Sequence, residues 1–266
     1  MTPILVFDIE TIPDVAGLRK LAVFEAGLTD ADVVTRAYAD REAATGRSFM
    51  PHYLQRIVAI SCVFRDDDGL RVRSLGEPGD GEAKLIGDFF RTVERYTPQL
   101  VSWNGGGFDL PVLHYRAMVH GIPASRYWDL GDEDREFKWN NYIARYHTRH
   151  SDLMDILSMY QARATAPLDA LAKLCGFPGK LGMDGSQVWQ AWQDGRIGEI
   201  RAYCETDVMN TWLLWSRFQL MRGTQTPAAF EAEVALAKAL LASLPGEHWR
   251  EYLAAWKVPA LEDPNP

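Results

Sequence analysis

Apolar runs separated by turn residues predict four strands in the first half of the chain. These runs cover residues 4–11, 57–64, 70–75 and 100–103. The second and third runs are joined by a turn at 66–69 that carries the Asp-Gly hairpin signal. Residues 81–96 have apolar positions at helical spacing, and residues from about 15 to 47 form a polar, helical insertion. This order predicts an α/β fold with a mixed sheet.

From about residue 151 onward, the pattern predicts a chain that is almost entirely helical. The predicted helices are 153–162, 168–174, 187–194, 197–221, 228–243 and 249–256. The last two follow Pro227, so we predict a main domain at 1–223 and a helical C-terminal extension at 224–266, packed on or beside it. The tail at 261–266 is expected to be frayed.

Composition narrows the class of protein. A chain of 266 residues with 47% hydrophobic residues and nine Trp can bury a sizeable core. Its net charge of −8 argues against a protein that coats nucleic acid, although a nuclease needs only local basic contacts. Cys62, Cys175 and Cys204 have no CxxC spacing, so we expect reduced thiols. With no basic leader and no run of eighteen apolar residues, we expect a soluble, cytoplasmic protein that does not bind membranes.

Two carboxylates stand at the end of the first apolar run, residues 4–11 (ILVFDIET). Side chains alternate along a strand, so Asp8 and Glu10 point to one face and Ile9 to the other. Two like charges a few ångströms apart repel each other, and burial strengthens that repulsion. The pair is therefore either an acidic strand end or a site for a cation.

A second acidic position follows the fourth run. In residues 104–109 (NGGGFD), three glycines precede a helix that starts near Leu110, and we expect them to let the backbone turn freely. Asp109 stands where a helix N-cap belongs, so its carboxylate either caps the helix or contributes to a site. Asn104 could likewise serve only the turn.

A third position lies within the long predicted helix at 197–221. Tyr203 and Asp207 are four residues apart, so they project from one face of that helix. The apolar residues after them indicate that the helix packs on the sheet. Alone, the pair would be a tyrosine at the edge of the core beside a solvated aspartate.

Together, the three positions resemble the DEDD 3′–5′ exonucleases, and the Tyr-x-x-x-Asp form at 203–207 is that of the tyrosine branch. Residues 7–11 (FDIET), 104–109 and 203–207 resemble motifs of the exonuclease domain of family B DNA polymerases. The chain up to about residue 223 is most similar to stand-alone bacterial proteins described as predicted polymerase-B-like 3′–5′ exonucleases. The resemblance implies a ribonuclease-H-like mixed sheet of five to six strands, flanked by helices.

The resemblance also implies a cofactor of two Mg²⁺ or Mn²⁺ ions. By resemblance, Asp8 bridges both ions, Glu10 and Asp207 complete the first, and Asp109 holds the second. Tyr203 then orients the attacking water. Hard oxygen ligands suit these ions, and two ions about 3.5–4 Å apart can clamp the attacking and leaving oxygens of a phosphodiester. A tyrosine with an ordinary pKa of about 10 positions water more readily than it deprotonates it.

Substrate contacts are predicted on both sides of the carboxylates. Thr11 and Ile12 follow the metal-binding strand, and Asn104 and Phe108 precede the aspartate after the glycines, so all four could meet the terminal nucleotide. Each is equally compatible with a packed side chain or a turn. Lys180, in a Pro-Gly-Lys loop, is a further candidate.

Residues 135–150 interleave cations with aromatic rings, as single-strand binding surfaces do. The basic residues are Arg135, Lys138, Arg145 and Arg149, and the rings are Phe137, Trp139, Tyr142 and Tyr146. We select Arg149 as a candidate contact; the alternative is a solvated loop with some rings packed on the core. No cysteine or second spaced histidine supports a zinc site at His147 or His150.

Three functions remain open at this point. The first is an exonuclease that releases nucleoside 5′-monophosphates from the 3′ end of single-stranded DNA or frayed duplexes. The second is the same chemistry on RNA, which the sequence does not separate from the first. The third is a nucleic-acid-binding protein without turnover, which would require a missing ligand, and none is missing. Protein partners are not identified by the sequence.

Overall fold

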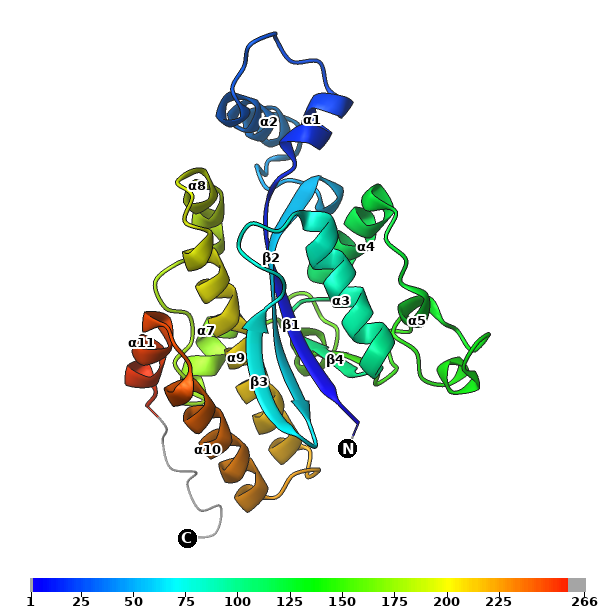
Figure 1. Cartoon of the computed structure of the whole chain (residues 1–266), viewed down its shortest axis with the longest axis vertical. Helices are drawn as coiled ribbons and strands as arrows, with labels where there is room; N and C mark the ends of the chain where they lie inside the picture. The colour runs from blue at the N-terminus through cyan, green and yellow to red at the C-terminus, as the bar shows by residue number, and fades with distance from the viewer. Residues whose placement is uncertain (1, 258–266) are drawn as a thin grey trace.

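The computed structural model of the protein describes residues 2–257, which contain one five-stranded sheet (Figure 1). The strands are β1 (Ile4–Pro13), β2 (Gln55–Asp66), β3 (Gly69–Ser74), β4 (Gln99–Ser102) and β5 (His150–Asp152). Their order is β3-β2-β1-β4-β5. β1 pairs antiparallel with β2 and parallel with β4, so the predicted mixed sheet is confirmed.

Helices surround this sheet. They are α1 (Val15–Leu21), α2 (Asp30–Thr45), α3 (Glu82–Tyr96), α4 (Asp109–His120), α5 (Ser125–Trp128), α6 (Leu153–Leu157), α7 (Leu168–Leu174), α8 (Val188–Gln193), α9 (Ile197–Met221), α10 (Pro227–Ser243) and α11 (Glu247–Ala255), with short 3₁₀ turns at His52–Leu54, Arg135–Lys138 and Gly185–Gln187. Most of the predicted helices appear within one or two residues of their expected ends.

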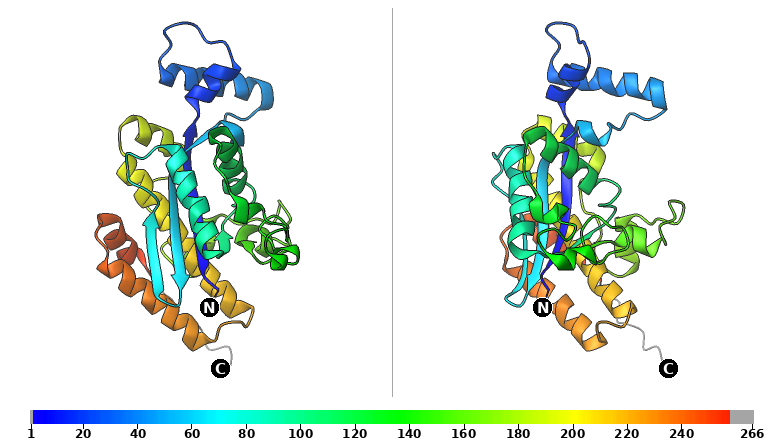
Figure 2. Two further views of the ribbon diagram at one scale, coloured as in Figure 1. Left: turned by 45° about the vertical axis from the view of Figure 1, so that its right-hand side comes forward. Right: turned by 90° about the vertical axis from the view of Figure 1, so that its right-hand side faces the viewer.

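The two faces of the sheet carry different helices, and β1 supplies alternate residues to each. Val6 lies in a core cluster with residues of α7, α9, α10 and α11, whereas Leu5, Phe7 and Ile9 lie in a cluster with residues of α3 and α4. Asp8 and Glu10 have the parity of Val6, so the alternation directs them toward the face that α9 covers. The two views in Figure 2 show α9 and α3 on opposite sides of the sheet.

One helix prediction in the second half of the chain was wrong. The helix predicted at 153–162 ends at Leu157, because Met159 and Tyr160 adopt left-handed backbone conformations with φ of 51° and 59°. The five strands agree with the five to six that the resemblance implied, although β5 was not located by the sequence pattern, since three residues are too few to show a period. The predicted insertion forms two helices, α1 and α2, instead of one continuous helical stretch.

The insertion stands beyond the end of β1, at one extreme of the molecule (Figures 1 and 2). A buried ion network lies at its base. Arg116 of α4 donates to Glu82 at 2.8 and 2.5 Å and to Asp14 at 2.5 Å, and Glu82 also accepts the Ile57 N–H at 2.7 Å. This network joins the end of β1 to β2, α3 and α4.

The C-terminal helices pack on the sheet and on α9. Phe230 and Val234 of α10, with Trp249 and Tyr252 of α11, lie in the same core cluster as Val6. The domain boundary at residue 223 stays a prediction, and the predicted frayed tail at 261–266 lies outside the described residues.

Candidate active site

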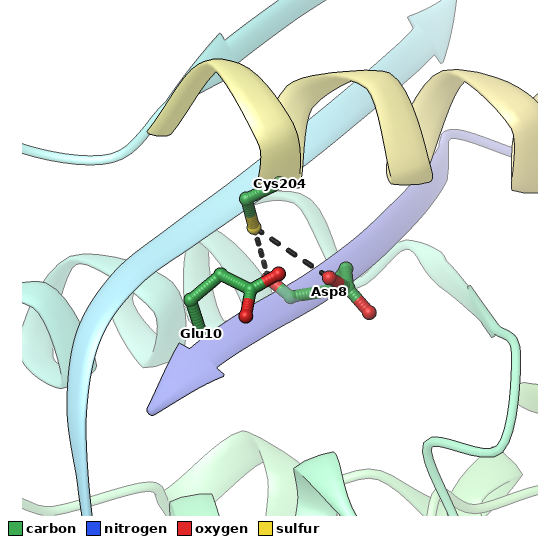
Figure 3. Close-up of side chains that lie close together, drawn as sticks. All are labelled: Asp8, Glu10 and Cys204. Atoms are coloured by element: carbon green, nitrogen blue, oxygen red, sulfur yellow. Dashed lines mark hydrogen bonds between the residues drawn. The ribbon is translucent and has the colours of Figure 1, made fainter. Parts of the chain in front are cut away.

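Asp8 and Glu10 project from β1 toward α9, as the strand alternation predicts. With Cys204 of α9 they form a group whose potential ligand atoms all lie within 4.8 Å of one another (Figure 3). The Cys204 thiol lies 3.4 Å from the Asp8 carbonyl oxygen and 3.6 Å from its carboxylate. A β-bulge after Glu10, where the register with β2 shifts, re-aims the chain just beyond the pair.

Asp109 reaches β1 from the start of α4. Its Oδ1 accepts the Ile9 N–H at 3.0 Å. This N–H has no strand partner on that side, because the pairing of β4 with β1 extends only from Ile4 to Val6. The N-cap interpretation is therefore wrong: Phe108 occupies the cap position, and Asp109 is the first residue of the helix.

The glycines before Asp109 are needed for close approach and not for unusual dihedrals. The left-handed residue of this turn is Asn104, with φ of 64°. A Cβ on Gly105 would lie 2.4 Å from the Ser102 hydroxyl, and one on Gly107 would lie 2.5 Å from Asn104 Oδ1. The tight turn brings the start of α4 against β1, which is what places Asp109 at the site.

Tyr203 and Asp207 share one face of α9, as their spacing predicts, and both contact Lys180. The Lys180 ammonium donates to Asp207 Oδ2 at 2.6 Å and to the Tyr203 hydroxyl at 2.5 Å. The other oxygen of Asp207, Oδ1, is buried without a hydrogen-bond partner among the described residues. A buried carboxylate oxygen left in this condition is a position where a cation fits.

The electrostatics of the group are those of buried acids whose charges also repel one another. Burial, followed by the charges of Asp109 and Asp207, raises the pKa of Asp8 well above its usual range. Burial and the charge of Asp8 do the same to the pKa of Glu10, and burial raises the pKa of Asp109 to about 7. Burial also raises the pKa of Asp207, although Lys180 opposes the shift. Divalent cations would relieve this repulsion, and the oxygen donors suit Mg²⁺ or Mn²⁺.

The loop that carries Lys180 is held by the C-terminal half of the chain. Asn210 of α9 accepts the Gly179 N–H at 3.1 Å and donates to the Gly179 carbonyl at 2.8 Å. Tyr252 of α11 donates to Asn210 at 2.8 Å, and both residues are fully buried. The last helix thus supports the residue next to Lys180.

Only some of the predicted substrate residues line a cavity next to the carboxylates. Thr11 and Phe108 line a cavity of about 520 Å³ that also reaches Glu10. Ile12 is packed in a core cluster with Tyr203, and Asn104 shapes the glycine turn. The Arg149 guanidinium lies 3.9 Å from the Phe137 ring centre and donates to the Asn140 carbonyl, so the structure does not bring it to the carboxylates.

Sequence reasoning missed part of the site. Tyr38, Phe49 and Trp189 line the cavity next to Glu10, and no local pattern brings these distant residues together. Cys204 could have been found, because it is three residues from Asp207 and shares its side of the helix.

Comparisons with known proteins agree with this geometry. A family model described as a predicted 3′–5′ exonuclease related to the exonuclease domain of PolB matches residues 47–256. This is well over half of the chain, so the protein belongs to that family, as predicted. The match contains Asp109, Tyr203 and Asp207, whereas Asp8 and Glu10 precede it. Nucleases of this class act on nucleic acid and normally use divalent metal ions.

One similar solved structure is the family B DNA polymerase of the hyperthermophilic archaeon Pyrobaculum calidifontis. The TM-score is 0.52 at 21% identity, and the aligned region covers 83% of this chain and 25% of the polymerase. This likeness confirms the ribonuclease-H-like fold. No match was found among curated proteins. Within residues 2–257, no helix combines the length and apolar character needed to cross a bilayer.

Proposed function

We propose that this protein is a metal-dependent exonuclease that removes nucleotides from the 3′ end of single-stranded DNA or frayed duplexes and releases nucleoside 5′-monophosphates. The observation that supports the proposal is the group of acids at the middle of β1. Asp8 and Glu10 lie side by side, Asp109 contacts the strand at Ile9, and Asp207 has a buried oxygen without a hydrogen-bond partner among the described residues. The charges of Asp109 and Asp207 both raise the pKa of Asp8. Acids this close serve no evident packing purpose, whereas phosphodiester hydrolysis needs such a group to hold cations.

The residues present fit two divalent ions. Asp8, Glu10 and Asp207 would hold one ion, and Asp8 and Asp109 would hold the other. When bound, such ions stabilise the charge that develops on the attacking and leaving oxygens.

Tyr203 would orient the attacking water. Its pKa is raised by burial and by the nearby carboxylates, so the phenol stays protonated and does not act as a base. Lys180 donates to the phenol oxygen, so the phenol directs its own proton to an acceptor, and in this structure the Asp207 carboxylate is one. The Lys180 ammonium, which lies 2.6 Å from Asp207, would also contact the scissile phosphate.

The cavity next to Glu10 would take the terminal nucleoside. Phe108 and Phe49 approach with ring centres 5.7 Å apart, and Phe49 is 60% exposed, as expected of a ring that meets a ligand. A base stacked on an aromatic ring is worth about 1–3 kcal/mol. We therefore expect Phe49→Ala to raise KM about tenfold; an unchanged KM would remove Phe49 from the pocket.

The proposal is tested with 5′-labelled oligonucleotides and Mg²⁺ or Mn²⁺. We expect a ladder that shortens from the 3′ end, and a loss of about a thousandfold in Asp8→Ala, because several kcal/mol of charge stabilisation disappear. Asp40→Ala, which removes an exposed acid of α2, is the matched control. Full activity in Asp8→Ala or in EDTA would refute the proposal. Parallel DNA and RNA substrates decide which nucleic acid is preferred.

A further inference from the structure

A second, larger cavity opens on the other side of the glycine turn. Its volume is about 770 Å³, which lies in the range of ligand-binding cavities. It is lined by Gly106 and Gly107, by α4 at His114, by the segment 142–148, and by the end of α9 at Arg222. We call it the glycine-loop cavity.

The glycine-loop cavity adjoins the candidate active site through consecutive residues. Gly106 and Gly107 line it, Phe108 lines the cavity beside Glu10, and Asp109 contacts β1. One residue advances the chain by at most about 3.6 Å, so the two cavities lie within roughly two residues of each other at this turn. The glycines carry no side chains, so a bound strand can cross their backbone from one cavity to the other.

Aromatic rings and guanidinium groups meet in the glycine-loop cavity. The Arg145 guanidinium lies 4.4 Å from the Tyr160 ring centre, and Tyr146 packs against the same ring at 5.3 Å. Tyr146 is 77% exposed and Trp128 is 49% exposed. Exposed rings beside cations are the components with which proteins hold single-stranded nucleic acid.

The lining of the glycine-loop cavity carries two arginines, Arg145 and Arg222, and two aspartates, Asp152 and Asp155. Asp152 already accepts the N–H groups of Asn104 and Gly106, so the arginines are the groups that can meet a phosphate. Burial lowers the pKa of both His114 and His150 to about 4, so these imidazoles are neutral at pH 7. Arg145 pairs with Asp155 at 3.3 Å, but both side chains are partly exposed, and such a pair is weak enough for a phosphate to replace. His114 Nε2 is buried without a hydrogen-bond partner among residues 2–257, which leaves it for a polar group of a ligand.

We propose that the glycine-loop cavity binds the unpaired nucleotides immediately upstream of the 3′-terminal nucleotide. Their bases stack on Tyr146 and Trp128, and their phosphates contact Arg145 and Arg222. This assignment rests on the proposed exonuclease function and gives it a substrate class: the site engages several unpaired nucleotides at once and not only the one that is removed. It also gives a role to the half of segment 135–150 that does not pack into the core.

The test compares oligodeoxynucleotides from the dinucleotide to the octanucleotide. For the wild-type protein, KM should fall as the substrate lengthens. In the double variant Arg145→Ala/Tyr160→Ala, we expect KM for the octanucleotide to rise about tenfold or more, with a smaller effect on shorter substrates. The matched control is Arg95→Ala/Tyr96→Ala, which removes the same two side-chain types, also in contact at 5.0 Å, from the end of α3.

Three results would overturn the assignment: a KM that does not depend on length, a loss in the double variant that is equal at every length, or the same loss in the control. If the double variant does not fold, Tyr146→Ala, which removes only an exposed ring, takes its place. Fluorescence anisotropy of a labelled octanucleotide in EDTA gives a readout without catalysis. Absence of hydrolysis with intact, Arg145-dependent binding would refute the exonuclease proposal and leave the cavity assignment standing.

Discussion

Buried carboxylates lie at two places along β1, and the two groups differ in how well cationic side chains neutralise them. At the base of the insertion, Asp14 and Glu82 surround the Arg116 guanidinium, and Glu82 also meets His120 at 2.7 Å. Near the middle of the strand, Asp8, Glu10 and Asp207 lie near the ammonium group of Lys180, which bonds to Asp207. Asp109 adds a further acid, whose charge raises the pKa of Asp8. The first group is matched by its neighbours, and the second is left with excess negative charge.

This difference indicates that the Arg116 network has a structural role, whereas the carboxylate group is suited to binding a ligand. In the Arg116 network the acids are satisfied within the protein, so the network holds β1, α3 and α4 together and needs no ligand. In the carboxylate group the pKa values of the acids are raised, and one Asp207 oxygen has no partner among the described residues. Burying these acids close together costs free energy of folding, which packing elsewhere in the protein offsets. A bound cation would remove that cost.

The largest effect on stability is expected when the Arg116 network is broken. Arg116→Met leaves two buried acids without their guanidinium partner, which typically costs about 3–5 kcal/mol. Urea unfolding measures the loss. The activity of the fraction that remains folded should change little, because Arg116 makes its ion pairs with Asp14 and Glu82 and not with Asp8, Glu10, Asp109 or Asp207.

Arg91→Met is the control for that experiment. Its ion pair with Asp88 lies on the surface, with Arg91 67% exposed, so the expected loss is below about 1 kcal/mol. Equal stability of the Arg116 and Arg91 variants, or a selective loss of activity in the former, would contradict the division between a supporting and a chemical group.

The sequence was sufficient to predict the carboxylate group around Asp8 but not the Arg116 network. Strand alternation placed Asp8 and Glu10 together, and helical spacing placed Tyr203 with Asp207, because both rules act within one element. The resemblance to a family then joined elements that periodicity cannot join. Asp14, Glu82 and Arg116 come from three elements and belong to no local pattern, so nothing in the sequence marks them as partners.

Long-range geometry also explains the remaining differences. Lys180 was expected to contact substrate, yet in this state its ammonium bonds to Asp207 and Tyr203. Tyr38 and Phe49 reach the cavity beside Glu10 because the insertion stands over the end of β1. The fold class and the carboxylates were predictable, whereas the walls of the cavities depend on how distant segments pack.

An intermediate effect is expected from Asp109→Asn, which keeps the acceptor for Ile9 but removes one charge. The folded-state pKa of Asp109, about 7, lies above its ordinary value of 3.8. The folded protein therefore binds more protons than the unfolded chain between these pH values, and its stability falls as pH rises through them. The metal-free variant should avoid this fall and be more stable than wild type above about pH 7, by a few kcal/mol.

Thermal unfolding in EDTA at a series of pH values measures this difference. The two proteins should converge below about pH 3, where Asp109 is protonated in both the folded and the unfolded state. Adding Mn²⁺ at pH 8 should raise the Tm of the wild type more than that of the variant, because the variant has lost a ligand. A wild-type protein that is the more stable of the two at pH 8 without metal would argue that the carboxylate group is not strained.

The smallest effect is expected from Tyr252→Phe. This variant tests how much α11 contributes to positioning the Lys180 ammonium. The variant loses the hydrogen bond to Asn210, worth about 1 kcal/mol, and loosens the clamp on Gly179. We expect a small drop in Tm and a fall of about fivefold or less in kcat. The control is Ser216→Ala, which removes a buried hydroxyl on α9 that donates to Gln225 at 3.1 Å. This control should lower stability without lowering kcat. If both variants leave kcat unchanged, Asp207 and Tyr203 alone position Lys180, and α11 contributes only to the core. If only Tyr252→Phe lowers kcat, α11 helps to position Lys180 in the site.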